Sequence, residues 1–523
     1  MLRCVHINQR AAHQYKKYKN GFKDIPTIAR AHFHATAKRE ILPLIGVATV
    51  AIVARYSYKA LVRMEEEREE YMEELAEYEE KYGPVTGCSD SNASKSIPLG
   101  YLGVDLGSAN IRIAFAPRGS GSEPRVIEDR EGGRSTPVSV LFEEEESGAH
   151  GISAIGRLAK GKVHERYFRS TSEHVLNPRK LLQRKDNRAE EAIQAVIRSA
   201  SISAMEKATG KKYSMDKSPF VFSKEHEGLF NLNAVFTYPV GLASDNMGDD
   251  EFADVYRKAL KGLYEDSDEA ATMIPEPIAT IAAAEHFKLF PKGSDRTNPS
   301  LIIDVGADAI TMSLVSKDEV ISSSRVPGIG ADILTEALAK HMDERFQKSI
   351  SSSVGLLETD GMARQRMYDG AEIAIAELSR NTRTSITLPF LSIDPKSSQP
   401  CHLNESFSRG VLSSIVDSMI PARLGLAQKE VLSSSISQPN DLNALISSMA
   451  MGLFEQNGTN PFQLRAILMV GGGSRSPIFQ TACREALVTL GGEQFVSERL
   501  IVPQDEKVEE LTVLGAAFCG GKL

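Results

Sequence analysis

One short pattern occurs twice in the chain, far apart, and it limits the folds that the chain can adopt. The stretches YLGVDLGSANIRIAF at 101–115 and SLIIDVGADAITMSLV at 300–315 each contain an apolar strand that ends in an aspartate. A glycine follows two residues later, and a second strand with alternating apolar residues comes after it. Each stretch therefore predicts a β-hairpin with a glycine turn. Two such hairpins indicate two related lobes.

The aspartates of these hairpins, Asp105 and Asp304, need partners. A carboxylate in an apolar strand is costly unless it is paired, hydrogen-bonded or bound to a metal. Backbone N–H groups in a tight turn form an anion-binding nest, and an aspartate beside it can hold Mg²⁺ or its waters. Facing hairpins would clamp a magnesium-bound polyphosphate, with both aspartates as metal ligands. The alternative is that each aspartate caps an ordinary turn.

Two other stretches carry weaker signals of a binding cleft. A strand at Ala466–Val470 runs into the glycine-rich turn Gly471–Ser474 and then into a helix, so a ligand could approach the helix N-terminus closely. The same pattern is typical of plain loops. Glu276 lies between two prolines at the start of an alanine-rich helix. It is either a helix-start carboxylate or an acid that orients water in a cleft.

Composition narrows the function classes. A chain of 523 residues predicts two or more domains. The net charge of -8 argues against nucleic-acid binding by the whole protein. The five cysteines contain no CxxC pair, so zinc and dithiol motifs are absent from the sequence.

The first 98 residues differ from the rest. Residues 1–40 form a basic arm, and 41–62 form an apolar run that predicts one membrane-spanning helix. The alternatives for this run are a buried core helix or a signal-sequence core. Residues 63–98 predict an acidic helix and a flexible linker. The arm favours a mitochondrial presequence. The alternative is the cytosolic flank of a signal anchor in the endoplasmic reticulum membrane.

Taken in order, these motifs resemble the ATPase domain of the seventy-kilodalton heat-shock chaperones of the DnaK type. The stretches that carry the resemblance are GVDLGSAN, AIGRLAKGK, IPEPIATIAAAE, IIDVGADA, LMVGGGSRSP and LTVLGAAFCGG. The resemblance implies an α/β, two-lobed actin-like ATPase fold with duplicated β-hairpin/helix lobes over 99–523. Lobe I would cover 99–295, lobe II 296–500 and a closing helix 501–523.

The resemblance also implies ATP or ADP with Mg²⁺ as cofactors, and a role for each matched residue. Asp105 and Asp304 would position Mg²⁺ and the attacking water. Lys160 would contact the transferred phosphate, and Glu276 would orient the water. Arg475 would stack on the adenine. The other nucleotide-binding positions would be Gly107, Ser108, Ala109, Asn110, Gly306, Ala307, Gly330, Glu372, Ser379, Gly471, Gly472, Gly473 and Ser474.

The sequence departs from the family pattern mainly at the second hairpin. Asp308 adds negative charge near the expected phosphates, and Thr311 replaces an aspartate that helps to hold the metal. Ser108 and Ala109 replace paired threonines, and Ile375 and Ala376 replace a basic pair at the adenine. We therefore expect a weak ATP hydrolase or nucleotide switch. The alternatives are a catalytically degenerate interaction module and, more distantly, a sugar-kinase-type phosphotransferase.

The resemblance ends at Leu523, directly after the closing helix, so we expect no peptide-binding domain of the chain's own. Such a protein would serve chaperone or import-system proteins at a membrane.

The predicted span at 41–62 can be tested by alkaline carbonate extraction of membranes that contain the full chain. The protein should stay in the pellet, because an apolar run of about 20 residues is long enough to cross the bilayer. A variant without residues 41–62 should move to the supernatant. Release of the unaltered chain would contradict the span.

Overall fold

The computed structural model describes residues 100–117, 123–129, 131–144, 150–159, 175–209, 232–242, 248–261, 272–350, 355–393, 398–424, 439–504 and 506–520. The predicted basic arm, membrane span and acidic linker lie outside these residues, and so does Lys160. Those predictions therefore stay predictions. Within the described ranges, no helix combines the length and apolar character needed to cross a membrane.

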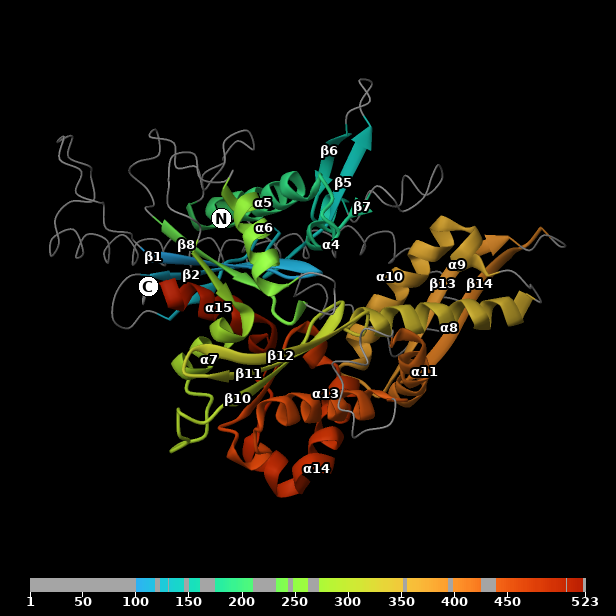
Figure 1. Ribbon diagram of the computed structural model, residues 1–523. Helices are drawn as coiled ribbons and strands as arrows, with labels where there is room; N and C mark the ends of the chain where they lie inside the picture. The colour runs from blue at the N-terminus through green and yellow to red at the C-terminus, as the bar shows by residue number, and fades with distance from the viewer. Residues whose placement is uncertain are drawn as a thin grey trace, which may run out of the picture. The chain divides into compact units, whose positions relative to one another are not determined.

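The first aspartate hairpin lies in the middle of the first sheet (Figure 1). The strand order is β3 (Arg125–Val126), β2 (Asn110–Pro117), β1 (Gly100–Leu106), β8 (Leu232–Tyr238) and β9 (Thr272–Pro275), and β4 (Thr136–Pro137) also pairs with β2. β1 runs antiparallel to β2 and parallel to β8. The end of β1, with its aspartate, therefore lies beside the end of another strand.

The second aspartate hairpin has the same place in the second sheet. The order there is β12 (Glu319–Pro327), β11 (Ala309–Ser316), β10 (Ser300–Val305), β15 (Ile467–Val470) and β16 (Leu500–Ile501). β10 runs antiparallel to β11 and parallel to β15. The two sheets thus repeat one arrangement, as the sequence predicted for the hairpins.

The repeat extends to individual hydrogen bonds. The Gly107 N–H donates to the Asn110 carbonyl at 3.0 Å in the first turn, and the Gly306 N–H donates to the Ala309 carbonyl at 2.9 Å in the second. Opposite Asp105 in the register lies Arg112. Thr311 has the equivalent place in the second hairpin. The two turns have the same backbone hydrogen bond and differ in their side chains.

Helices α7 (Glu276–His286) and α15 (Lys507–Gly520) contribute to the apolar layer that the two sheets share. Side chains alternate across a strand, so Ile302 joins this layer while its neighbour Ile303 faces the second-lobe helices. In β2, Ala114 likewise joins the shared layer while Ile113 faces the opposite side. Each sheet is therefore covered on both faces.

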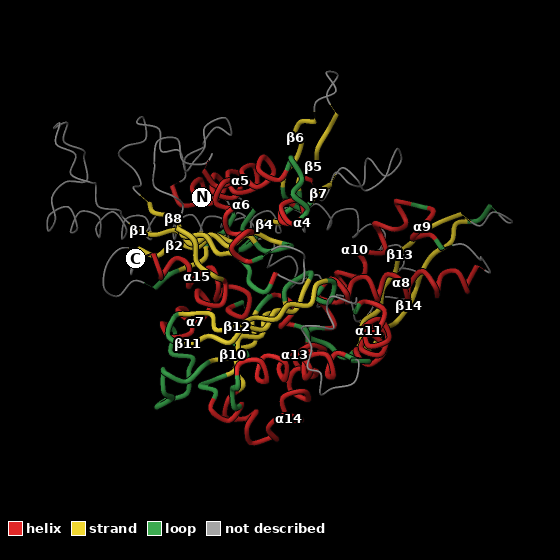
Figure 2. The backbone as a smooth tube through the Cα atoms, viewed as in Figure 1, coloured by secondary structure: helices red, strands yellow, loops and turns green. Residues whose placement is uncertain are grey.

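The other helices cover the outer faces and extend the second lobe (Figures 1 and 2). On the first sheet these are α4 (Pro178–Gln183), α5 (Ala189–Thr209) and α6 (Asp249–Lys261), with a small sheet of β5 (Val140–Glu144), β6 (His150–Ile155) and β7 (Val175–Leu176). The second lobe adds α8 (Asp332–Ile350), α9 (Leu356–Thr359), α10 (Gly361–Leu378), β13 (Arg383–Ile393), β14 (Pro400–Ser408), α11 (Arg409–Arg423), α13 (Leu442–Asn457), η4 (Pro461–Gln463), η5 (Gly472–Arg475) and α14 (Pro477–Arg499).

The contact between α15 and α7 leaves no room for a side chain at Gly515, because a Cβ atom there would lie 1.7 Å from the Ala279 carbonyl oxygen. Gly515→Ala should therefore force the helices apart and lower the free energy of unfolding by about 1–3 kcal/mol. Urea unfolding of the full chain measures this change. Gly410→Ala, in α11, is the matched control, since a Cβ atom at Gly410 meets nothing within 4 Å. Equal losses in the two variants would contradict the packing argument.

Candidate functional site

Four carboxylates from different parts of the chain converge on one buried region. Asp105 lies near the end of β1, Glu276 begins α7, Asp304 lies near the end of β10, and Asp308 lies in the turn after it. Glu276 and Asp304 line the same small cavity, together with Thr311. The negative charges of Asp105 and Asp304 both reach Glu276. The structure therefore brings together three of the four predicted catalytic residues.

Asp105 has a protein partner in the neighbouring parallel strand. The Thr237 hydroxyl, on β8, donates to Asp105 Oδ1 at 2.7 Å, and both residues are buried. This bond satisfies one of the two carboxylate oxygens. The partner comes from the sheet itself, because the parallel pairing of β1 and β8 sets the two strand ends side by side.

One of the cations in this region is Arg179, which the sequence analysis did not select. Its Nη1 atom lies 3.4 Å from Glu276 Oε1 and donates to the Leu106 carbonyl at 3.3 Å. Its side chain is 6% exposed, and among the described residues its Nε atom has no hydrogen-bond partner. A buried donor without a partner is costly. An anion such as a phosphate oxygen would satisfy it, so the region fits a phosphate ligand.

A local signal for Arg179 exists in the sequence. Asn177 caps α4 by accepting the N–H groups of Arg179 and Lys180 at 3.0 and 3.2 Å, and Pro178 is the first helical residue. Cations in the first turn of a helix oppose the helix dipole. The sequence therefore marks where this helix begins and that Arg179 lies in its first turn, whereas the carboxylate that Arg179 meets follows from tertiary packing.

Burial and charge shift the pKa values of these groups. Burial raises the pKa of Glu276 to about 8, although the Arg179 charge opposes the shift. Burial, followed by the charge of Asp105, raises the pKa of Asp304 to about 6. Burial alone would lower the pKa of Arg179, but the surrounding carboxylates, Glu276 first among them, raise it overall. Arg179 stays charged, and Glu276 is largely protonated near neutral pH.

The negative charge that Asp308 adds near the second hairpin is paired within the protein. Arg325, on β12, is buried, and its Nη2 atom lies 3.4 Å from both carboxylate oxygens of Asp308. Its Nη1 atom donates to the Thr311 hydroxyl at 3.2 Å. The arginine thus joins Asp308 and Thr311, two of the positions at which this hairpin differs from the pattern that the sequence resembles.

The glycine-rich turn after β15 packs directly on the second hairpin. Gly471 has φ +88°, and a Cβ atom there would lie 2.1 Å from Asp304 Oδ1. A Cβ atom at Gly330 would lie 2.4 Å from the Ala307 carbonyl oxygen, and one at Gly473 would lie 2.4 Å from Val305 Cγ1. By contrast, a Cβ atom at Gly472 would meet only Glu509 Oε2, at 3.9 Å. Close packing requires glycine at the other three positions.

The predicted nucleoside contacts are partly engaged within the protein. Arg475 pairs with Glu509 of α15, which also pairs with Arg112 of β2. The Ser474 hydroxyl donates to the Val470 carbonyl, and the Ser379 hydroxyl donates to the Ala376 carbonyl at 2.7 Å. Glu372 is exposed on α10. The Arg475 side chain, which was predicted to stack on adenine, is therefore in an ion pair with Glu509.

The first-hairpin positions predicted to bind nucleotide run from Gly107 in the turn to Asn110 at the start of β2. Asn177 Nδ2 donates to the Ser108 carbonyl, and the Val138 N–H donates to the Ala109 carbonyl at 2.8 Å. In the second hairpin, the Gly306 and Ala307 carbonyls accept N–H groups from the start of α8. Both turns are thus held from outside by other segments.

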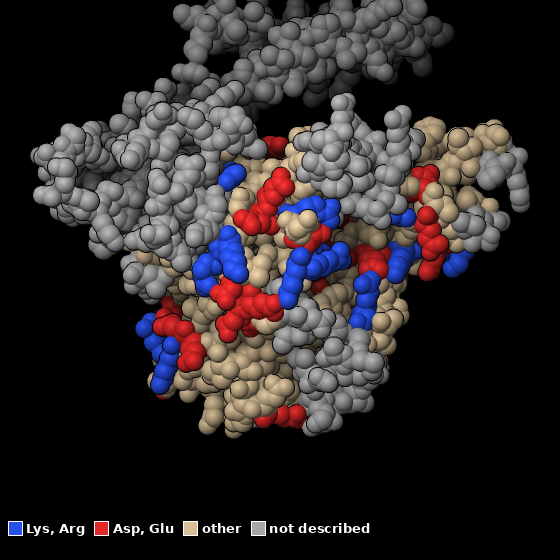
Figure 3. Space-filling model, turned by 45° about the horizontal axis from the view of Figure 1, so that its top comes forward, with Lys and Arg blue, Asp and Glu red and all other residues tan. Residues whose placement is uncertain are grey.

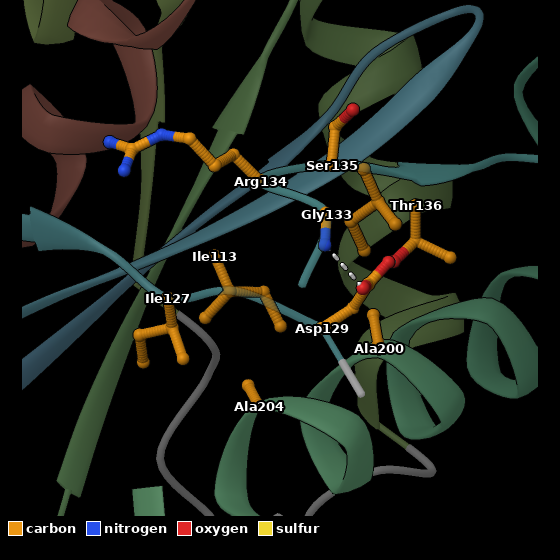
Figure 4. Close-up of a pocket in the computed structure, with 10 residues that line it drawn as sticks. Ile113, Ile127, Asp129, Gly133, Arg134, Ser135, Thr136, Ala200 and Ala204 are labelled. Carbon is orange, nitrogen blue, oxygen red and sulfur yellow. Dashed lines mark hydrogen bonds between the residues drawn. The ribbon is translucent and has the colours of Figure 1, made fainter. Parts of the chain in front are cut away.

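A second pocket lies beside β2, β3 and α5 (Figure 4). Its polar centre, Asp129, accepts hydrogen bonds from the Gly133 N–H at 2.7 Å and the Glu131 N–H at 3.0 Å. Arg157 Nη1 donates to its other oxygen at 2.5 Å. Because its oxygens are used within the protein, this carboxylate has a structural role.

On the molecular face in Figure 3, basic and acidic side chains are interspersed.

Across the described ranges, no group of three or more His, Cys, Asp and Glu side chains is arranged to hold a metal ion. Mg²⁺ that binds with a nucleotide usually needs only one or two carboxylates, with phosphates and waters as the other ligands. Asp105 and Asp304 are the pair available for such an ion.

Comparisons with known proteins agree on one family. Residues 280–452 match the family model described as Hsp70 protein. Two relatives are the chaperone protein DnaK from two strains of Thermus thermophilus, each 26% identical over 442 residues. The alignment covers 81% of this chain and 60% of each relative. The chain therefore spans less than two thirds of the relatives it matches.

The raised pKa values predict how stability depends on pH when nucleotide and metal are absent. Between the ordinary value of 4.5 and about 8, the folded chain binds a proton at Glu276 more tightly than the unfolded chain does. Stability should therefore be highest near pH 5 and fall as the pH rises to about 8. The Tm in EDTA should drop by about 2 °C or more over this interval.

Glu276→Gln should remove most of the fall in stability between pH 6 and 8, because glutamine does not titrate and the raised pKa of Asp304 acts only up to about pH 6. Glu493→Gln, at an exposed carboxylate, should leave the profile unchanged. The same slope in Glu276→Gln as in the unaltered chain would show that Glu276 is ionised at neutral pH.

Proposed function

Because residues 280–452 match the Hsp70 family model and the chain is similar to DnaK, we propose that it carries an ATPase domain of this type, whose cleft binds a magnesium nucleotide and hydrolyses ATP slowly. The observation that carries the proposal is the buried Arg179 guanidinium. Its Nε atom lacks a partner among the described residues, and it lies among carboxylates from both hairpins. A phosphate group would satisfy the donor, and a divalent cation would balance the carboxylates.

In this proposal Asp105 and Asp304 hold the metal ion or its waters. The turn backbones of 107–110 and 306–307 bind phosphate oxygens, and the turn at 471–474 approaches the nucleoside. Bound Mg²⁺ neutralises charge on the transferred phosphoryl group. Arg179 takes the role that the sequence suggested for Lys160, because it is the described cation next to Glu276.

Glu276 would orient the attacking water. Protonated at neutral pH, its carboxyl group would donate a hydrogen bond to the water as well as accept one, and it would have to ionise before it could accept a proton. The missing carboxylate at Thr311 removes one group that would position the metal. In other enzymes, loss of one preorganised group costs about 100-fold or more in rate. Slow turnover follows.

We further propose that residues 41–62 anchor the protein in a membrane, with the mitochondrion as the favoured compartment, and that it serves chaperone or import-system proteins. The chaperone part of this proposal is supported by the DnaK relatives.

A degenerate interaction module is the second candidate. The Arg475–Glu509 and Arg325–Asp308 ion pairs favour it, because both arginines already have protein partners in the cleft region.

Nucleotide binding can be measured as a thermal shift of the full chain. Mg-ATP at 100 times its dissociation constant should raise the free energy of unfolding by about 2.7 kcal/mol, and EDTA should reduce the effect. If millimolar Mg-ATP produces no shift, the interaction module becomes the better account.

Single-turnover hydrolysis tests whether Arg179 or Lys160 is the cation that acts on the transferred phosphate. Arg179→Gln should lower the rate by about 100-fold or more, because the guanidinium is the buried positive charge beside Glu276. Arg184→Gln, at the exposed end of α4, should leave the rate unchanged. If Lys160→Ala abolishes hydrolysis while Arg179→Gln does not, the role assigned to Arg179 is wrong.

A further inference from the structure

The Asp308 side chain lies at the place where the second hairpin would meet phosphates. It is in the turn between β10 and β11, two residues after Gly306. The Gly328 N–H donates to its backbone carbonyl at 2.7 Å, which holds the turn in place. Its side chain is 17% exposed, so the carboxylate is mostly withdrawn from solvent.

The groups that hold this carboxylate come from both lobes. Arg325 Nη2 lies 3.4 Å from each carboxylate oxygen. Burial alone would raise the pKa of Asp308, but the charges of Arg325 and Arg179 and a hydrogen bond from the Ser108 hydroxyl lower it overall. The carboxylate is therefore ionised, and Ser108 connects it to the turn of the first hairpin.

These partners are the same chemical groups that would bind a phosphate: two guanidinium groups and a hydroxyl next to a glycine turn. A carboxylate that already contacts Arg325 and lies in the field of Arg179 competes with a phosphate through charge repulsion, and at Arg325 through direct exclusion.

We propose that Asp308 is a built-in anion that occupies the phosphate subsite of the nucleotide-free protein and links the two hairpins. A nucleotide must displace it in order to bind. This inference rests on the proposed nucleotide binding and adds a residue that sets its affinity. Arg325 keeps the Thr311 hydroxyl as a partner when Asp308 moves away, so its guanidinium stays in position to bind the incoming phosphate.

The test compares dissociation constants for Mg-ATP, Mg-ADP and adenosine, measured by calorimetry on the full chain. Asp308→Asn should tighten the binding of both phosphorylated ligands by about tenfold or more, because the like charge is removed. Adenosine, which has no phosphate, should bind within about twofold of its original constant. Asp318→Asn, an equal charge change in the exposed β11–β12 turn, should change nothing.

An equal gain for adenosine, or no gain for ATP in a chain that binds ATP, would overturn the competition while leaving the proposed function intact. Amide exchange in the nucleotide-free protein tests the link between the hairpins separately. Asp308→Asn and Ser108→Ala should each raise exchange at the Gly107 amide by about tenfold, because the first turn loses its contact with the second lobe. If no variant binds any nucleotide, the proposed function fails, and unchanged exchange would then overturn the link as well.

Discussion

Four carboxylates can share one buried cleft in this protein because two guanidinium groups are buried with them. Arg179 comes from the first lobe and Arg325 from the second, and each is in contact with a carboxylate of its own lobe. Charges at this depth interact far more strongly than they would in water, so removing one arginine would leave its partner without compensation. Each lobe thus contributes both a carboxylate and a guanidinium group to the cleft.

The ion pairs of α15 connect this cleft to the rest of the molecule. Glu510 binds Arg134 in a bidentate pair, with 2.6 and 2.9 Å between donor and acceptor atoms. Glu509 of the same helix joins Arg112 of the first sheet to Arg475 of the glycine-rich turn. One helix therefore holds a strand of one lobe and the glycine-rich turn of the other. The apolar face of the same helix is buried against both sheets.

The hairpins could be predicted from the sequence because their signals are local. An apolar strand, an aspartate and a glycine turn lie within a few residues, and the structure has the same pairing in both copies. The cations could not be predicted in the same way. Arg325 meets Asp308 only because β12 folds back along β11, and Arg179 meets Glu276 only because α4 approaches α7. Such partners depend on tertiary packing, and the local spacing around Asp308 gave no sign of its compensation.

The glycine-rich turn separates two kinds of evolutionary constraint. Gly471 and Gly473 are required by the protein's own packing, so any descendant that keeps this fold must keep them whether or not it binds a ligand. Gly472 has open space around it, and no neighbouring atom among the described residues demands a glycine there. Its persistence among descendants would therefore reflect selection for something that approaches the turn from outside. Free drift at that position, beside fixed neighbours, would mark a lineage that has kept the architecture and abandoned the ligand.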